Sequence, residues 1–237
     1  MLISEELLLE GCNDIGVALD KTAIDRFDTY AKLLREYNEK VNLTAITEPD
    51  DIVIKHFIDS LYLMRFVEIK NGMKLCDVGT GAGFPGAALL CAVPELKVTL
   101  FDSINKKLDF IRYLLKELDL NAEIVTIRAE EAGKKPEYRE KFDIVTARAV
   151  AQLNILSEYC IPLVKVGGIF APMKAPLSTE EEQRGFCAIG NLGSKVINKH
   201  HYSITDGSER EIIICKKNEP TNKNFPRNAA RISKKPL

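Results

Sequence analysis

The chain has 237 residues, of which 46% are hydrophobic and 28% are charged, and its formal net charge is −1. This length fits one large domain, or one domain with an appendage, and it allows a sizeable core. No apolar run approaches the roughly 20 residues of a membrane-spanning helix, and the acidic start lacks the basic segment of a secretory signal, so we expect a cytoplasmic protein without membrane contact.

The first 71 residues are predicted to form a helical unit without strands. Residues 22–41 carry apolar side chains at helical spacing, and Asp20 or Thr22 is a candidate N-cap. Residues 52–69 predict one or two further helices. The apolar stripe of the first helix comprises Ile24, Phe27, Ala31, Leu34, Tyr37 and Val41.

From Gly72 onwards, predicted strands alternate with predicted helices. Strands are expected at 73–79, 97–103, 122–129, 141–150 and 169–175, and helices at 84–93, 104–120, 151–165 and 180–193. Gly167 and Gly168 are interpreted as a turn before the fifth strand. Strands at 194–204 and 210–218 flank the turn signal TDGSE. This order predicts an α/β fold with a doubly wound, mostly parallel sheet over residues 72–217 and an antiparallel addition at one edge.

The charge is unevenly distributed along the chain. Residues 1–50 carry 11 acidic and 5 basic side chains, whereas residues 216–237 carry 7 basic and 1 acidic. A basic C-terminal tail over residues 218–237 suits a phosphate backbone. A solvated, partly disordered end is the simpler interpretation, and composition alone favours it.

No metal-binding pattern is present. The six cysteines form no C-x-x-C pair, and buried, reduced thiols are the expected state. His200 and His201 are adjacent, so in a strand they point to opposite faces. We therefore predict no metal site.

The stretch KLCDVGTGAGFPGAALL, residues 74–90, places a glycine-rich loop directly after a buried strand. Glycines there allow tight turning and close approach of the backbone to a ligand. The loop lacks G-K-[ST], which excludes a Walker phosphate loop. A dinucleotide motif exists formally as Gly81, Gly83 and Gly86, but it begins two residues late. Read from Gly79, the pattern D-x-G-x-G-x-G favours an S-adenosylmethionine loop over an NAD loop.

Two later strand ends carry candidate nucleoside contacts. Asp102, 23 residues after Gly79, is placed to accept hydrogen bonds from ribose hydroxyls, or to act as a helix N-cap. Glu130 and the backbone of Ala129 are placed to contact an adenine ring. Their alternative role is an acidic start of a surface helix. Both interpretations stay open for each position.

Arg148 ends the fourth strand in TARAVA, where donor and acceptor meet in such folds. It is a candidate for holding the donor's carboxylate or a substrate phosphate, and a solvated rim arginine is the alternative. The Asp/Asn-Pro-Pro-aromatic segment of adenine-amine methylases is absent, which argues against an exocyclic amine as the target.

Together, DVGTGAGFPG, FDSINKKLDF, RAEE, FDIVTARAVA and LVKVGGIF resemble the RsmG (GidB) family over roughly residues 30–237. The upstream NLTAI and KHFIDSL and the basic end are similar to the same family. The resemblance implies a Rossmann-like class I methyltransferase that uses S-adenosylmethionine to methylate guanine N7 in 16S ribosomal RNA or the small ribosomal subunit. It implies donor contacts at Gly79, Gly81, Phe84, Asp102, Ala129, Glu130 and Arg148. Thr80 stands where the family usually has serine, and Ala230 and Ile232 where it often has glycine and proline.

The expected mechanism needs no catalytic residue. Guanine N7 has a lone pair and no proton, so positioning and desolvation are the enzyme's main contributions. We expect an RNA surface formed by the helical unit and the tail, with Lys55, His56, Lys174, Arg227, Lys234 and Lys235, on a protein expected to be monomeric. A structural, hydrogen-bonded His56 is an equal alternative.

Three other functions remain open from the residues. They are a methyltransferase for a small molecule or protein, an NAD-dependent oxidoreductase, and a non-catalytic RNA-binding module. The basic tail argues against the first, the glycine register against the second, and the intact loop with Asp102 and Arg148 against the third.

Overall fold

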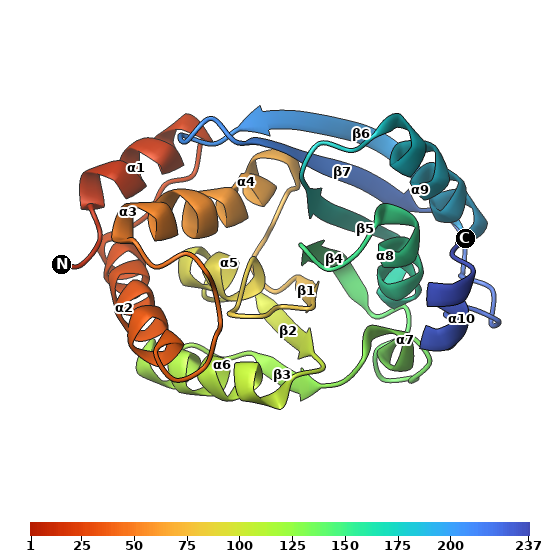
Figure 1. Cartoon of the computed structure of the whole chain (residues 1–237), viewed down its shortest axis with the longest axis horizontal. Helices are drawn as coiled ribbons and strands as arrows, with labels where there is room; N and C mark the ends of the chain where they lie inside the picture. The colour runs from red at the N-terminus through yellow and green to blue at the C-terminus, as the bar shows by residue number, and fades with distance from the viewer.

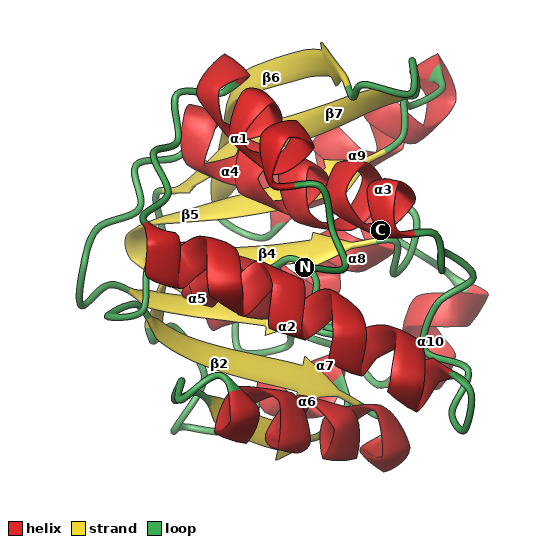
Figure 2. Ribbon diagram, turned by 90° about the vertical axis from the view of Figure 1, so that its left-hand side faces the viewer, coloured by secondary structure: helices red, strands yellow, loops and turns green.

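The computed structural model describes all 237 residues as one seven-stranded sheet with helices on both faces (Figures 1 and 2). The strand order is β3-β2-β1-β4-β5-β7-β6, in which β1 to β5 are parallel and β7 and β6 are antiparallel additions. The predicted α/β class and the antiparallel edge are therefore confirmed. The strands are β1 (Lys74–Val78), β2 (Lys97–Asp102), β3 (Glu123–Thr126), β4 (Phe142–Arg148), β5 (Val164–Lys174), β6 (Ser194–Ser203) and β7 (Glu209–Lys217).

The N-terminal part is helical, as predicted. Asp20 caps the second helix, since its Oδ1 accepts a hydrogen bond from the Ala23 N–H at 2.7 Å. The predicted helix pair after Pro49 is one continuous helical stretch that contains a π-helical turn. The elements are α1 (Glu5–Asp14), which the pattern analysis did not predict, α2 (Lys21–Asn38), α3 (Pro49–Ile52), the π-helix η1 (Val53–Ile58) and α4 (Asp59–Phe66).

Two hydrophobic clusters fill the space between the sheet and its helices. The larger cluster joins the N-terminal helices to α5 (Gly86–Ala92) and α6 (Asn105–Glu117) on one face. The smaller one lies on the other face beneath α7 (Ala129–Ala132), α8 (Leu153–Cys160), the 3-10 turn η2 (Ile161–Leu163) and α9 (Thr179–Asn191). The expected helix over 151–165 is thus shorter, because β5 begins at Val164.

The prediction of a turn at Gly167 and Gly168 was wrong. Both residues lie inside β5, where the pairing with β4 moves from Phe142–Val164 to Ile144–Ile169. Three extra residues on β5 form a bulge, and Gly167 takes φ +85°, which glycine adopts without steric cost. A turn signal thus marks a bulge when tertiary pairing continues on both sides.

The C-terminal tail is packed rather than solvated. The Arg139 guanidinium donates to the carbonyl oxygens of Phe225 and Thr221, both at 2.7 Å. The tail ends in α10 (Ala229–Lys234), whose Ile232 side chain is fully buried. The interpretation of a disordered end was therefore wrong, although the charge of the tail remains.

The cysteines are all free, and five of the six are buried. Burial raises the pKa of the Cys12 and Cys91 thiols to about 12. No helix of the chain combines the length and the apolar character that a membrane crossing requires.

Candidate functional site

The glycine loop (residues 79–85) connects the end of β1 to the start of α5. Gly79, Gly81 and Gly83 have φ values of +71°, +58° and +104°, a region in which a Cβ is strained. A Cβ on Gly79 would also lie 2.6 Å from Val150 Cγ2, whereas Gly81 faces open space. The loop therefore needs glycine for its conformation at three positions, and for space at Gly79 and at Gly83, where a Cβ would lie 2.3 Å from the Tyr30 hydroxyl oxygen.

Asp77, at the end of β1, holds this loop in shape. Its Oδ2 accepts hydrogen bonds from the Thr80 hydroxyl at 2.7 Å and the Gly86 N–H at 2.9 Å. Its Oδ1 is buried without a partner. Burial raises the pKa of Asp77 to about 6, although these two hydrogen bonds oppose the shift.

A cavity of about 190 Å³, here named the loop cavity, opens at the carboxyl ends of the first three strands. Gly79, Asp102, Ala129 and Glu130 line it together, as does Val150. The sequence-predicted nucleoside contacts are thus brought to one place, and their contact with a donor stays a prediction.

Asp102 is part of the cavity wall and also binds the backbone on either side of it. Its Oδ2 accepts from the Gly81 N–H at 3.0 Å, and its Oδ1 accepts from the Ile104 N–H at 2.9 Å. The helix-cap alternative is therefore wrong, because α6 begins at Asn105 with Ile104 as an N-cap that has no side-chain bond, and the ribose contact stays a prediction. Gly81 is tied to this cavity through Asp102.

Phe84 lies away from the loop cavity. Its ring stacks between Tyr30, at a centroid distance of 5.2 Å, and His56, at 4.3 Å. The Tyr30 hydroxyl donates to the Ala82 carbonyl oxygen at 2.6 Å. Phe84 thus fixes the glycine loop to the helical unit, and direct contact with a donor has no support in this geometry.

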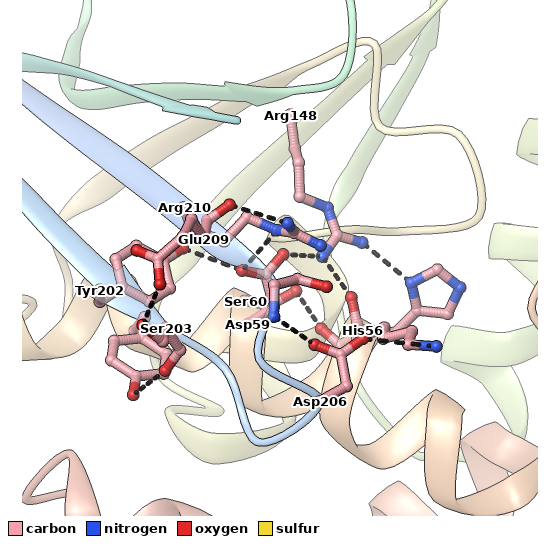
Figure 3. Close-up of polar contacts among 12 residues, drawn as sticks. His56, Asp59, Ser60, Arg148, Tyr202, Ser203, Asp206, Glu209 and Arg210 are labelled. Carbon is pink, nitrogen blue, oxygen red and sulfur yellow. Dashed lines mark hydrogen bonds and ion pairs between the residues drawn. The ribbon is translucent and has the colours of Figure 1, made fainter. Parts of the chain in front are cut away.

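Arg148 points toward the helical unit, where its guanidinium donates hydrogen bonds to the Asp59 carboxylate and to a backbone carbonyl of the π-helix (Figure 3). The Arg148 NH1 group lies 2.7 Å from Asp59 Oδ2 and 3.1 Å from the Lys55 carbonyl oxygen. Tyr202 donates to the other Asp59 oxygen at 2.8 Å. Arg148 is therefore neither a solvated rim residue nor a wall of the loop cavity.

His56 completes this network as a neutral side chain. Arg148 NH2 donates to His56 Nδ1 at 3.2 Å, so Nε2 carries the proton and donates to the Thr44 hydroxyl at 2.9 Å. Burial and the neighbouring Arg148 charge lower the pKa of His56 to about 3. His56 is therefore a hydrogen-bonded structural side chain, as the alternative prediction for this residue states.

A second cavity of about 650 Å³ opens beside Arg148. It is lined by polar side chains from the helical unit, β4, β5, α9 and β7, and by a smaller apolar set. These polar residues are Lys55, His56, Asp59, Arg148, Lys174, Glu181 and Arg210.

Residues 149–151, here named the dividing segment, separate the two cavities. Ala149 and Ala151 line the second cavity, whereas Val150 lines the loop cavity. Ala149 has φ +57°, which is uncommon for a residue with a side chain. Backbone strain of this kind is concentrated at functional sites.

A larger cavity, of about 770 Å³, lies at the opposite edge of the sheet beside Lys74 and Lys97. These residues begin β1 and β2, so this cavity is far from the glycine loop. Ligands of open α/β sheets bind at the carboxyl ends of the strands, and we therefore assign the site to the two smaller cavities.

The six residues expected to contact RNA lie in three different environments. Lys234 and Lys235 are exposed on α10. Lys55 forms ion pairs with Asp51 at 2.9 Å and Asp206 at 3.4 Å at the rim of the second cavity. His56 and Lys174 line that cavity.

Arg227 corrects the expected RNA surface. Its guanidinium forms hydrogen bonds with both oxygens of Glu158, a fully buried residue, at 2.6 to 3.1 Å. Such a bidentate pair fixes the tail to α8 and leaves little of the charge for a phosphate. The sequence could not reveal this, because Arg227 and Glu158 are 69 residues apart.

Pattern reading missed several residues of the site. Asp77 was visible in D-x-G-x-G-x-G as the first letter, but only its glycines were interpreted. Asp59 lies in KHFIDSL beside Lys55 and His56, in the helical unit expected to form the RNA surface, but its ion pair with Arg148 carries no local signal. Tyr30 and Glu181 carry no motif signal, and Val150 lies in TARAVA, where only Arg148 was interpreted. The roles of all three arise from contacts between distant segments.

Comparisons of the sequence with known proteins find similar proteins over nearly the whole chain. The family model described as GidB, rRNA small subunit methyltransferase G, matches residues 23–207. The chain is 45% identical over 234 residues to the ribosomal RNA small subunit methyltransferase G of Acetivibrio thermocellus, covering 98% of this chain and 96% of that protein. It is 44% identical to the protein of the same name from Staphylococcus epidermidis, covering 99% of each.

Solved structures show the same fold at low identity. TrmN from Thermus thermophilus superimposes with a TM-score of 0.53 at 17% identity, covering 68% of this chain and 48% of TrmN. Precorrin-6y C5,15-methyltransferase from Geobacter metallireducens gives 0.51 at 15% identity, covering 73% and 89%.

Proposed function

Because the chain belongs to the GidB family of small-subunit rRNA methyltransferases, its activity is rRNA methylation from S-adenosylmethionine, and we propose guanine N7 of 16S rRNA as the acceptor. The observation that carries this proposal is the match over almost the whole chain, glycine loop and dividing segment included. The donor cavity and the acceptor cavity are then the two cavities on either side of that segment.

The loop cavity suits the nucleoside part of the donor. Gly79 and Gly81 let the backbone approach a ligand. Asp102 would accept from the ribose hydroxyls, and Ala129 and Glu130 would border the adenine.

The chemistry asks for positioning rather than proton transfer. Bound S-adenosylmethionine would supply an electrophilic methyl on a sulfonium. The N7 lone pair would bond to that carbon while the carbon–sulfur electron pair leaves with the neutral thioether product, and no proton has to be removed. The residues of the second cavity agree with this. His56 is held neutral between Arg148 and Thr44, and the Arg148 charge is paired with Asp59. The expected contribution of the chain is to orient the base and exclude water.

The acceptor base has to leave its helix to reach this cavity. In A-form RNA, N7 faces a deep and narrow major groove that side chains cannot enter. A flipped base needs an enclosed pocket with polar groups at its edges. The second cavity, with seven polar or charged residues in its lining, offers such a pocket.

For docking of the RNA, we propose a surface around α10 with Lys234 and Lys235 in place of Arg227, which is paired with Glu158. These two lysines are exposed and unpaired. The rRNA assignment rests on the family. An NAD-dependent reaction is disfavoured, because the glycine spacing of the loop does not fit an NAD motif and the matching family model describes a methyltransferase.

The decisive experiment measures methyl transfer directly. Purified protein, labelled S-adenosylmethionine and small subunits from cells that lack the enzyme should give N7-methylguanine in 16S rRNA, identified by mass spectrometry. Unmodified guanine N7 after exhaustive incubation with both free 16S rRNA and subunits would overturn the acceptor assignment.

The docking surface has its own test. Lys234→Glu combined with Lys235→Glu should weaken RNA binding and lower its salt dependence by about 1 to 2 in logarithmic slope. Donor affinity measured by calorimetry should stay unchanged. The matched control is Lys74→Glu with Lys97→Glu, two exposed lysines at the far edge of the sheet. Equal losses in both double variants would contradict a specific docking surface.

A further inference from the structure

A side chain that donates hydrogen bonds, Lys174, lies next to one that accepts them, Glu181, in the second cavity. Lys174, the last residue of β5, places its Nζ 2.9 Å from Glu181 Oε1 in the first turn of α9. The same Nζ donates to the Ala151 carbonyl oxygen at 2.7 Å, which anchors the pair to the dividing segment. Their side chains are only 14% and 22% exposed, so the pair is largely desolvated.

Each partner keeps unused hydrogen-bonding capacity. Glu181 Oε1 accepts from Lys174 and from the Leu153 N–H at 2.9 Å, but Oε2 has neither a hydrogen bond nor an ion pair. The ammonium group has three protons, and its two contacts leave one. Burial alone would raise the pKa of Glu181, yet the bonds to Lys174 and Leu153 outweigh it and lower the pKa, so the carboxylate is ionised.

This adjacent pair is complementary to one purine edge. Guanine presents an acceptor at O6 next to donors at N1 and N2, whereas adenine presents a donor at N6 next to an acceptor at N1. Building on the proposed function, we propose that Lys174 and Glu181 read the acceptor base, with the ammonium on O6 and the Oε2 atom on the N1–H and N2–H₂ groups.

The orientation that results is suited to transfer. O6 and N7 are neighbours on the purine, so a base held at O6 by Lys174 keeps N7 near the dividing segment. Gly79 of the loop cavity lies on the other side of that segment, and the Val150 side chain of the segment faces the same cavity. Adenine in the same pose would direct an amine at the ammonium and a lone pair at the carboxylate, and such mismatched polar groups are strongly rejected.

Glu181 also has a structural role, since it accepts from the first N–H of α8. Glu181→Gln separates the two roles, because the amide oxygen can replace Oε1 while the amide nitrogen replaces the free acceptor Oε2. Glu180→Gln is the matched control, because Glu180 sits in the same turn but pairs with the exposed Arg184.

The test uses the full-length protein and 16S rRNA with guanine or inosine at the target position. Inosine lacks the N2 amine but keeps O6, N1–H and N7. With guanine, Glu181→Gln should lower kcat/KM about 10- to 100-fold, as expected for loss of a bidentate base contact. Its donor affinity, measured by calorimetry, should match that of Glu180→Gln at a temperature at which both variants are folded.

Comparing guanine with inosine as the target base tests whether Glu181 has only a structural role. The wild-type enzyme should prefer guanine over inosine, and Glu181→Gln should reduce that preference at least threefold. An unchanged guanine-to-inosine ratio, an unchanged kcat/KM, or a wild-type enzyme that accepts both bases equally would overturn the inference. A wild-type enzyme that methylates no guanine N7 would instead overturn the proposed function.

Discussion

The two cavities on either side of the dividing segment are built in different ways. The loop cavity is formed by the ends of β1, β2 and β3 and by one glycine loop, so its residues follow from strand positions along the chain. The second cavity depends on side chains that meet across 89 residues, from Asp59 to Arg148, and 143 residues, from Asp59 to Tyr202. A site made by backbone geometry can be located from spacing, whereas one made by an ion-pair network requires the tertiary structure.

The largest expected effect comes from removing Asp59, the centre of the ion-pair network at the second cavity. Asp59→Ala should lower the free energy of unfolding by about 3 to 5 kcal/mol, because Arg148 stays buried without its carboxylate. Urea denaturation measures this loss. The control Asp51→Ala removes only the exposed pair with Lys55 and should cost under about 1 kcal/mol. Similar losses in the two variants would show that the network is not the main support of the second cavity.

The pH dependence of stability gives a second test of the same region. His56 has a pKa of about 3 in the folded protein and about 6.5 when unfolded, so the unfolded chain binds the extra proton between these values. Stability should therefore fall as the pH drops through this window, by about 2 kcal/mol between pH 7 and 4.5. His56→Asn should flatten this part of the profile in denaturation experiments. A slope identical to the wild type would contradict the buried neutral state.

Glycine substitution tests the loop cavity. Gly79→Ala should cost about 1 to 2 kcal/mol of stability, because φ is +71°, and should also weaken donor binding, because its Cβ approaches Val150. Gly72→Ala provides the control, since Gly72 has φ +78° and no atom within 4 Å of a built Cβ. Calorimetry should find a donor affinity loss only for Gly79→Ala. If both variants bind the donor like the wild type, the loop cavity is not the donor site.

The smallest expected effect concerns Asp77, whose titration has the opposite sign to that of His56. Because its folded pKa is about 6, above the ordinary 3.8, the folded state holds the proton more tightly and stability falls as the pH rises through this range. Asp77→Asn retains an oxygen for Thr80 and Gly86 and should raise the free energy of unfolding by about 1 kcal/mol at pH 7.5. Asp77→Ala should lower it instead, since both donors lose their acceptor. A lower stability of both variants would disprove the penalty for the buried charge.

Periodicity and loop spacing identified most of the fold. The parallel sheet, the antiparallel edge pair and helix α2 with its Asp20 cap agree with the pattern, because each depends on local sequence. Gly167 and Gly168 were misread because pairing with β4 overrides a local turn preference.

The candidate site divides in the same way. Gly79, Asp102, Ala129 and Glu130 meet at one cavity because parallel strands end at the same edge. Arg148 and Phe84 lie elsewhere, because their partners Asp59 and Tyr30 come from the helical unit. Composition placed Arg227 at the RNA, but a buried Glu158 binds it, and no local signal announces such a partner.

The larger hydrophobic cluster is one set of buried side chains in contact with each other, and its members come from segments between Ile3 and Ile214. Tyr30 and Phe84 lie within it, so the helical unit and the glycine loop share one interior. We expect a protease to find no site at which it could release residues 1–71 as an intact fragment and leave a working remainder. For the evolution of the chain, the helices are then not an interchangeable attachment to a nucleoside-binding sheet, because any change in them is transmitted to the loop.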